Sequence, residues 1–128
     1  MSDVMATFSC MAYGYVVKVR VNGSDIGVTG GKSEGKRLFN ADHSMASQMP
    51  ADMRKQLAVL KEGANRFEIE FKKSGGANDS LTIELMLDDP DPVFSVASSK
   101  KAAGKVDRTI DLAKPVTTKV TDAEITPA

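Results

Sequence analysis

The sequence predicts an all-β protein, an antiparallel β-sandwich of jelly-roll-like type with about six to eight short strands and at most one short helix. Two observations lead to this prediction. Apolar and polar residues alternate strictly over the runs 67–72 and 81–87, and glycine, asparagine and aspartate are frequent in the segment between them. Alternation with a period of two is typical of strands that bury one face and expose the other to water.

Length and charge limit the domain organisation and the kinds of partner. A chain of 128 residues is normally one domain. We expect a sandwich over residues 1–113, followed by a flexible C-terminal tail or an added edge strand over residues 114–128. The chain has 17 basic and 17 acidic residues, so no overall field favours binding to nucleic acid or to an anionic membrane.

The expected location follows from three further features. No apolar run approaches the ~20 residues that cross a bilayer. The N-terminal residues lack the basic and apolar segments of a signal peptide. The single cysteine cannot form an internal disulfide. Together these features predict a cytoplasmic protein without a membrane segment.

The N-terminal part predicts a strand and a tight turn. Residues 13–21 alternate between the two faces and are rich in valine and tyrosine, which suit a pleated surface. Asn22 and Gly23 follow, and both tolerate the positive φ angles of a two-residue hairpin turn. Ile26 and Val28 are then expected on a short return strand. The apolar stretch 4–11 is either a separate edge strand or the start of the strand at 13–21.

A glycine-rich segment over residues 27–35 is expected to be a flexible loop. Its residues Gly27 to Ser33 resemble a phosphate-binding loop, which requires four residues between its first glycine and the Gly-Lys-Ser group. Here Gly27 and Gly31 enclose only three residues, and Gly35 follows where a helix should begin. The spacing therefore predicts an ordinary loop, followed by a brief strand at 37–39.

The segment 40–60 contains the predicted helix and a group of methionines. Residues 50–57 fit one or two helical turns, because proline suits the first helical position, but 53–60 also fit a strand. Met45, Met49 and Met53 recur every four residues, which would stack them on one helical face. Methionines of this kind either fill gaps in a core or form an adaptable interface.

The alternating runs 67–72 and 81–87 are predicted to form an antiparallel hairpin. A register with Lys72 opposite Glu84 pairs opposite charges and places Phe71 opposite Leu85 on the buried face. Beyond this hairpin, prolines stop regular structure over residues 88–92. Shorter apolar stretches at 93–96 and 106–112 predict two more strands.

Few residues are candidates for chemistry. Asp88, Asp89 and Asp91 form an acidic cluster that either supplies oxygen ligands to calcium or makes a proline-rich turn. His43 is the only histidine and stands between Asp42 and Ser44 in a polar loop, so we expect its side chain to be solvated. These three neighbours do not predict a hydrolytic triad, because the members of a triad come from separate segments.

The remaining reactive or charged side chains also have structural explanations. Cys10, among apolar neighbours, is expected to pack as a small apolar group. The lysine pairs at 72–73 and 100–101 are expected to be solubilising charges. No stretch interleaves aromatic and basic residues in the way that single-stranded nucleic acid requires. We therefore expect no enzyme activity and no cofactor.

Two segments carry a resemblance to a known family. The residues Val21-Asn22-Gly23 end a predicted strand, and the segment from Leu60 to Ile69 reads LKEGANRFEI. Together they resemble the galactose-binding-like β-sandwiches, jelly-roll modules that accompany glycoside hydrolases. The resemblance implies the same architecture and gives these residues a structural role. The chain lacks tryptophan and has two tyrosines, whereas sugar sites stack a ring of the sugar on an aromatic side chain.

The function that the sequence favours is that of a non-enzymatic interaction module, which associates with itself or with a protein partner through a sheet face, an edge or the segment of Met45, Met49 and Met53. The alternative is an accessory domain that binds a carbohydrate or another small polar ligand. A large apolar two-fold interface would favour the first function. A concave pocket with amide or acidic side chains beside a tyrosine would favour the second.

Overall fold

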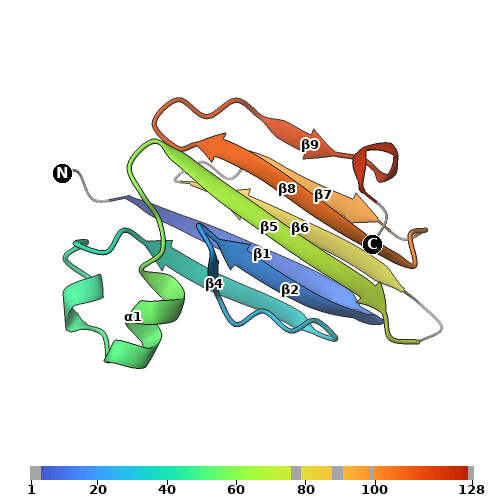
Figure 1. Ribbon diagram of the computed structural model, residues 1–128, viewed down its shortest axis with the longest axis horizontal. Coiled ribbons are helices and arrows are strands. Elements are labelled where there is room, and N and C mark those ends of the chain that lie inside the picture. Colours follow the sequence, from blue (N-terminus) through green and yellow to red (C-terminus); the bar gives the residue numbers. More distant parts are fainter. Residues whose placement is uncertain (1–3, 76–78, 88–90, 99, 127–128) are drawn as a thin grey trace.

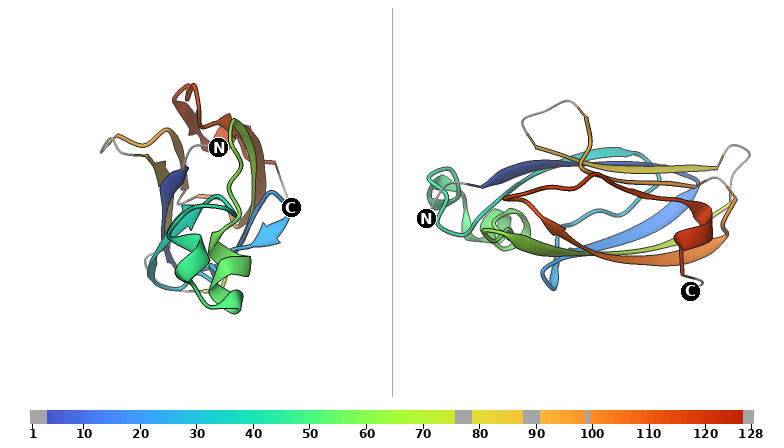
Figure 2. Two further views of the ribbon diagram at one scale, coloured as in Figure 1. Left: turned by 90° about the vertical axis from the view of Figure 1, so that its left-hand side faces the viewer. Right: turned by 90° about the horizontal axis from the view of Figure 1, so that it is seen from above.

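The computed structural model describes residues 4–75, 79–87, 91–98 and 100–126. Two β-sheets pack face to face around one core, as Figures 1 and 2 show. Sheet A has the strand order β4-β1-β6-β7-β9, with bounds Ser33–Phe39, Met5–Tyr13, Ser80–Met86, Phe94–Ser98 and Thr118–Val120. Sheet B has the order β3-β2-β5-β8, with bounds Ser24–Asp25, Tyr15–Val21, Ala64–Lys73 and Ala103–Asp111.

The predicted fold class, an antiparallel β-sandwich with one short helix, is confirmed. All neighbouring strands pair in antiparallel fashion except β7 and β9, which are parallel. The strands exceed the six to eight expected, because β3 and β9 have only two and three residues and give little sequence signal. Alternating side chains from both sheets fill the core, including the fully buried Phe8, Val19, Ile69, Ile83 and Phe94.

The predicted hairpin of 67–72 with 81–87 is wrong. Strand β5 pairs with β2 and β8, whereas β6 pairs with β1 and β7 in the opposite sheet. Lys72 therefore lies opposite Val16 and Ala103, and Glu84 lies opposite Ser9 and Ser95. The alternation determines which side of each strand is buried. Two strands that face each other across a core satisfy it as well as two paired neighbours do.

A second crossing between the sheets occurs at Gly14. Residues 13–21 are therefore not one strand, since β1 ends in sheet A at Tyr13 and β2 begins in sheet B at Tyr15. Gly14 has a φ of 76°, which favours glycine, and a Cβ there would collide with the carboxylate of Asp79. Strand β1 is also not an edge strand, because it lies between β4 and β6.

The turn at Asn22 and Gly23 is confirmed. Their φ angles are 51° and 85°, and Val21 pairs with Ser24 across the turn, as in the type I′ hairpins that such residues favour. The regular return strand ends at Asp25, but the chain continues beside β2. The Ile26 N–H donates to the Val19 oxygen, and the Val17 N–H donates to the Thr29 oxygen.

The segment after β4 is partly helical. The helix α1 spans Ala51–Leu57 directly after Pro50, so the helical alternative for this segment is the one observed. A short 3-10 helix, η1, precedes it at Ala46–Gln48, and Met49 between them is extended. This break means that Met45, Met49 and Met53 do not share one helical face. The methionine spacing has no periodic meaning here, because the helix begins only after Pro50.

The C-terminal segment closes one open side of the sandwich. Its strand β9 extends sheet A, and after the 3-10 helix η2 (Asp122–Glu124) Thr126 exchanges two backbone hydrogen bonds with Lys105 of sheet B. Val120 and Ile125 are 1% and 3% exposed. Within residues 114–126, Thr118–Val120 thus form a short strand at the edge of sheet A, and Val120 and Ile125 belong to the common core, whereas Val116 is exposed.

Candidate interaction face

The outward-facing side chains of sheet A form a surface with few charges, which we call the A face. Antiparallel pairing places residues directly opposite one another on the same side of a sheet. The A face therefore contains, in rows across β4, β1, β6, β7 and β9, one row of Arg37, Thr7 and Met86, one of Gly35, Ser9, Glu84, Ser95 and Lys119, and one of Ser33, Met11, Thr82 and Ala97. Tyr13 and Ser80 form a further row at one end of β1, and Met5 lies on the same side at its other end.

Large apolar side chains on the A face are accessible. Met5, Met11 and Tyr13 of β1 are 38%, 37% and 48% exposed, although β1 is a central strand. Arg37, Glu84 and Lys119 are the charged residues on the A face. Protein interfaces are depleted in charge at their centre and enriched in tyrosine and methionine relative to the rest of the surface. The A face shares the accessible methionines and tyrosine of such interfaces, and it also contains serines and, in its middle row, Glu84.

The outer side of sheet B, which we call the B face, has the opposite character. Most of its side chains are charged: Lys18, Arg20, Asp25, Arg66, Glu68, Glu70, Lys72, Lys105, Asp107 and Asp111. Arg66 binds Asp107 on the neighbouring strand with both its Nε and its terminal nitrogen, at 3.0 and 2.6 Å. The hydrogen bond from Arg66 holds the pKa of Asp107 below its usual value. A surface of this kind is typical of a solvated sheet face.

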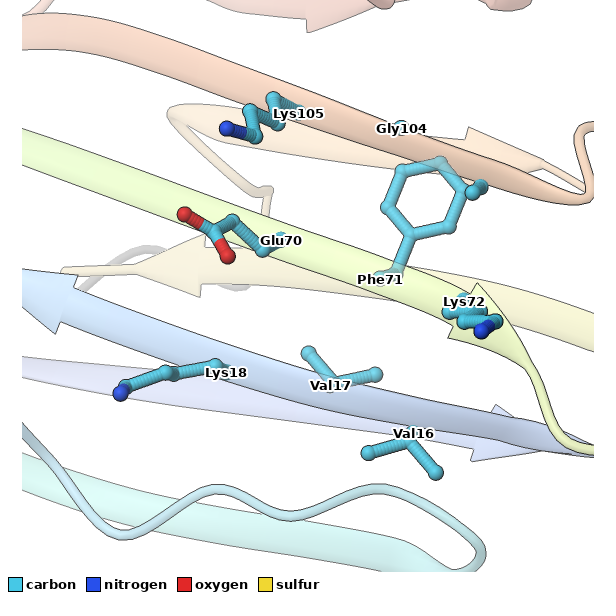
Figure 3. A pocket seen from close by; sticks show the side chains of 9 residues that line it. Val16, Val17, Lys18, Glu70, Phe71, Lys72, Gly104 and Lys105 are labelled. Atoms are coloured by element: carbon cyan, nitrogen blue, oxygen red, sulfur yellow. The ribbon is translucent and has the colours of Figure 1, made fainter. Parts of the chain in front are cut away.

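A shallow hollow of about 280 Å³ lies on the B face. Val16 and Ala103 supply apolar surface, and Lys18, Lys72 and Lys105 surround it with Glu70. Figure 3 shows Glu70 between Lys18 and Lys105, and the Phe71 ring directed toward Gly104. Phe71 is only 3% exposed, so its ring offers no open platform for a sugar. The hollow contains the acidic Glu70 but no tyrosine among its lining residues, whereas a carbohydrate site was expected to combine the two.

The glycine-rich loop that resembles a phosphate-binding loop is bound by the protein's own carboxylate. Glu34 accepts hydrogen bonds from the backbone N–H of Thr29, at 3.3 Å to each of its oxygens, and from that of Gly30 at 3.0 Å. The segment after Ser33 is strand β4, not a helix. The N–H groups that a phosphate would need are thus directed at Glu34, and no helix N-terminus follows to supply positive charge.

His43 is buried, contrary to the expectation of a solvated side chain. It is 7% exposed, its ring lies 4.8 Å from that of Phe39, and its Nδ1 accepts the Met45 N–H at 2.9 Å. The polar sequence around it hid this packing, because the contact with Phe39 forms only when the chain turns back over the end of β4. The His43 side chain thus stabilises the first turn of the segment that leads to α1.

Cys10 packs in the core, as predicted. The thiol-bearing residue is fully buried on β1, and burial raises the pKa of Cys10 to about 12, with a further increase from the negative charge of Glu34. A thiol with this pKa is protonated at neutral pH and is a poor nucleophile.

The methionine segment presents two of its three side chains to solvent. Met45 and Met53 are 52% and 47% exposed, and Met49 is half-buried. Met45 directly precedes η1, Met49 lies in the extended link and Met53 lies on α1, at one end of the sandwich (Figure 1). Their interface role stays a prediction.

The acidic cluster lies largely outside the described residues. This holds for Asp88 and Asp89, whereas Asp91 is described and exposed. Within the described ranges, no group of three or more histidine, cysteine, aspartate or glutamate side chains is arranged to hold a metal ion. Two members of the lysine pairs, Lys72 and Lys100, are exposed as expected. The Nζ of Lys73 lies 3.6 Å from the Oδ2 of Asp79 and forms an ion pair with it.

The sequence analysis expected a sheet face as one possible interaction surface, but it did not predict the residues of the A face, although a signal was present. Residues 4–13 contain no charged side chain on either face of the strand, whereas a half-exposed strand normally has polar or charged residues on its outer side. The lack of charged residues in this strand therefore indicated that its outer side, as well as its side in the core, is a contact surface.

Comparison of the chain with protein-family models, with curated proteins and with solved structures found no match. Among the described residues, no helix has the length and apolar composition that crossing a membrane would demand.

Proposed function

We propose that this protein is a non-enzymatic interaction module, which associates with a second copy of itself or with another protein through the A face. The observation that carries this proposal is the contrast between the two sheet surfaces. The A face has few charges and exposes Met5, Met11 and Tyr13, whereas the B face is covered by charged side chains. The two faces belong to one fold of neutral net charge, so composition alone does not produce the difference.

The accessible apolar side chains of the A face favour a protein over a small molecule as its partner. Small ligands bind in concave sites that bury most of their surface, whereas Met11 and Tyr13 lie accessible on the outer side of β1, next to β6. Sheets that pack on one another have such interfaces, in which alternate residues of each strand meet across about 10 Å.

The absence of enzyme activity is part of the proposal and rests on two residues. His43 uses its Nδ1 to accept a backbone N–H and packs on Phe39. Cys10 is buried with a raised pKa. The cytoplasmic location and the resemblance to galactose-binding-like modules stay predictions from the sequence.

A pair of threonine variants tests the proposal. Thr82→Lys places a charge in the middle of the A face, and Thr109→Lys places the same charge on the B face. Both side chains lie on the outer side of a strand, so both variants should fold. We expect Thr82→Lys to abolish association, measured by light scattering after size exclusion and by affinity capture of partners from the source cells, and Thr109→Lys to preserve it.

Two outcomes would overturn the proposal. One is a complex, with itself or with another protein, that survives Thr82→Lys. The other is a complex that Thr109→Lys weakens as much as Thr82→Lys does. Circular dichroism of both variants shows whether a loss of binding reflects a loss of folding.

A further inference from the structure

We infer that the partner on the A face is a second copy of this chain, packed face to face about a two-fold axis that runs nearly parallel to β1, with Arg37 of each copy beside Glu84 of the other. The inference rests on the proposed function, and it adds the identity of the partner and the register of the contact.

Sheet order determines which strands meet in such a pair. Strands β4 and β6 flank β1 on its two sides. In a symmetric dimer that packs face to face, the two-fold axis lies in the plane of the interface, and each residue contact occurs twice. Rotation about an axis along β1 leaves each row at the same height along the strands and exchanges the two sides of β1. Strand β4 of one copy therefore lies over β6 of the other.

Strand register then places the charges. Glu84 shares its row with Gly35, and Arg37 shares the next row with Met86. Glu84 of one copy therefore lies over Gly35 of the other, where the missing side chain leaves room for the carboxylate. Arg37 lies one row away, which is about 7 Å along the strand. A long arginine side chain bridges that distance, since the two sheets are themselves about 10 Å apart.

Charge complementarity distinguishes this arrangement from its competitor. A two-fold axis perpendicular to the strands and through the row of Glu84 would place β6 over β6 and bring Glu84 close to its own copy. Like charges facing each other across an interface are unfavourable. An axis along β1 instead gives each Glu84 an arginine partner. Beside it, the small side chains of Ser33 and Thr82 meet in the row that contains Met11.

The expected strength follows from the overlap. Three strands of seven to nine residues, β4, β1 and β6, meet their counterparts. They cover roughly 400 Å² of projected area on each copy. Interfaces of this size belong to weak or transient complexes. We therefore expect a monomer–dimer equilibrium that depends on concentration and weakens as salt is added.

Charge reversal tests the register. Sedimentation velocity of the full chain over a concentration series gives the dimer dissociation constant. Arg37→Glu and Glu84→Arg should each raise it roughly tenfold or more, because each removes two ion pairs and creates two repulsive ones. The double variant restores opposite charges at both positions and should return the constant close to the wild-type value. The matched control, Lys119→Glu, reverses a charge of the A face that lies outside the overlap and should have little effect.

Each result decides between distinct conclusions. A wild-type chain that stays monomeric at every concentration overturns the inference, as does a dimer in which the double variant is no tighter than the single ones. If the wild type is monomeric but Thr82→Lys still removes a captured partner protein, the proposed function stands and only the second copy as partner is excluded. If neither association exists, both fail.

Discussion

The side chains of Asn22 and Asn65 are joined by a hydrogen bond of 2.8 Å, from the Nδ2 of Asn22 to the Oδ1 of Asn65. Asn65 is fully buried and also accepts the Lys61 N–H at 2.7 Å, while its Nδ2 donates to the oxygens of Lys61 and Gly63. The two segments that carry the resemblance to galactose-binding-like modules therefore meet in space. Their asparagines connect the β2–β3 turn to the start of β5.

Replacing Asn65 by alanine should destabilise the fold by about 2–4 kcal/mol. The substitution removes the side-chain partners of the N–H and the oxygen of Lys61, and one of two donors to the Gly63 oxygen, which also accepts the Leu112 N–H. Part-buried groups that lose their partner pay a desolvation cost. Urea unfolding followed by circular dichroism measures the change. Thr109→Ala on the exposed B face is the control, with little expected effect. If Asn65→Ala lowered the free energy of unfolding no more than the control does, water would replace the hydrogen bonds of the amide.

Replacing Gly104 by alanine should cost about 1–3 kcal/mol, the usual range for overpacking. A Cβ at Gly104 would lie 2.7 Å from the Cζ of Phe71 and would also strike the side chain of Ile125. Gly35→Ala on β4 is the matched control, because nothing lies within 4 Å of its Cβ position. Thermal unfolding of both variants compares them. Equal melting temperatures would mean that the Phe71 ring moves aside freely.

Ile125→Ala should destabilise the protein by about 2–5 kcal/mol, the range for a large buried side chain reduced to alanine. Ile125 is 3% exposed and contacts the region of Gly104 and Phe71, whereas Val116 in the same C-terminal segment is 77% exposed. Val116→Ala should therefore leave the free energy of unfolding almost unchanged. If both substitutions proved neutral in denaturant titrations, the C-terminal segment would not be part of the core in solution.

Stability should decline in alkaline solution because of Cys10. The thiol has an ordinary pKa of 9.0 and a pKa of about 12 in the folded protein, so the folded state holds the proton more tightly. Its contribution is fully present below pH 9.0 and is lost as the pH rises toward 12, by up to ~1.4 kcal/mol per pH unit. Tyr15 acts in the same direction, since burial also raises its pKa.

A Cys10→Ala variant isolates the contribution of the thiol, because Tyr15 is present in both proteins. The difference in unfolding free energy between wild type and variant should shrink as the pH rises above 9.0. A constant difference across this range would contradict the prediction. Slow modification of the native protein by a thiol reagent at neutral pH provides an independent check.

Local sequence rules predicted the parts of the structure that depend on neighbouring residues. The burial of Phe67, Ile69 and Phe71 followed from their alternation, and the hairpin turn followed from the positive φ angles of Asn22 and Gly23. Pro50 marked the start of α1. Each of these features arises within a few residues of chain, where side-chain period and backbone preference act directly.

The pairing of strands and the burial of His43 depend on contacts between distant segments, which local sequence rules do not describe. The alternation in β5 and β6 predicts that each strand has a buried side. Two sheets face the core, however, and the same pattern fits a strand in either sheet. Only the packed sandwich, with crossings after β1 and β5, separated Phe71 from Leu85 across the core. The burial of His43 arose in the same way, from a contact with Phe39 that no local rule contains.

The sequence by itself determined the all-β class, the buried side of β2, β5 and β6 and the tight turn at Asn22 and Gly23. The tertiary structure alone decided which strands are neighbours, that Val120 and Ile125 complete the core, and that Arg37 and Glu84 share one uncovered face. The reason is that side-chain period is a local property. The sheet in which a strand lies depends instead on the sum of contacts between distant segments.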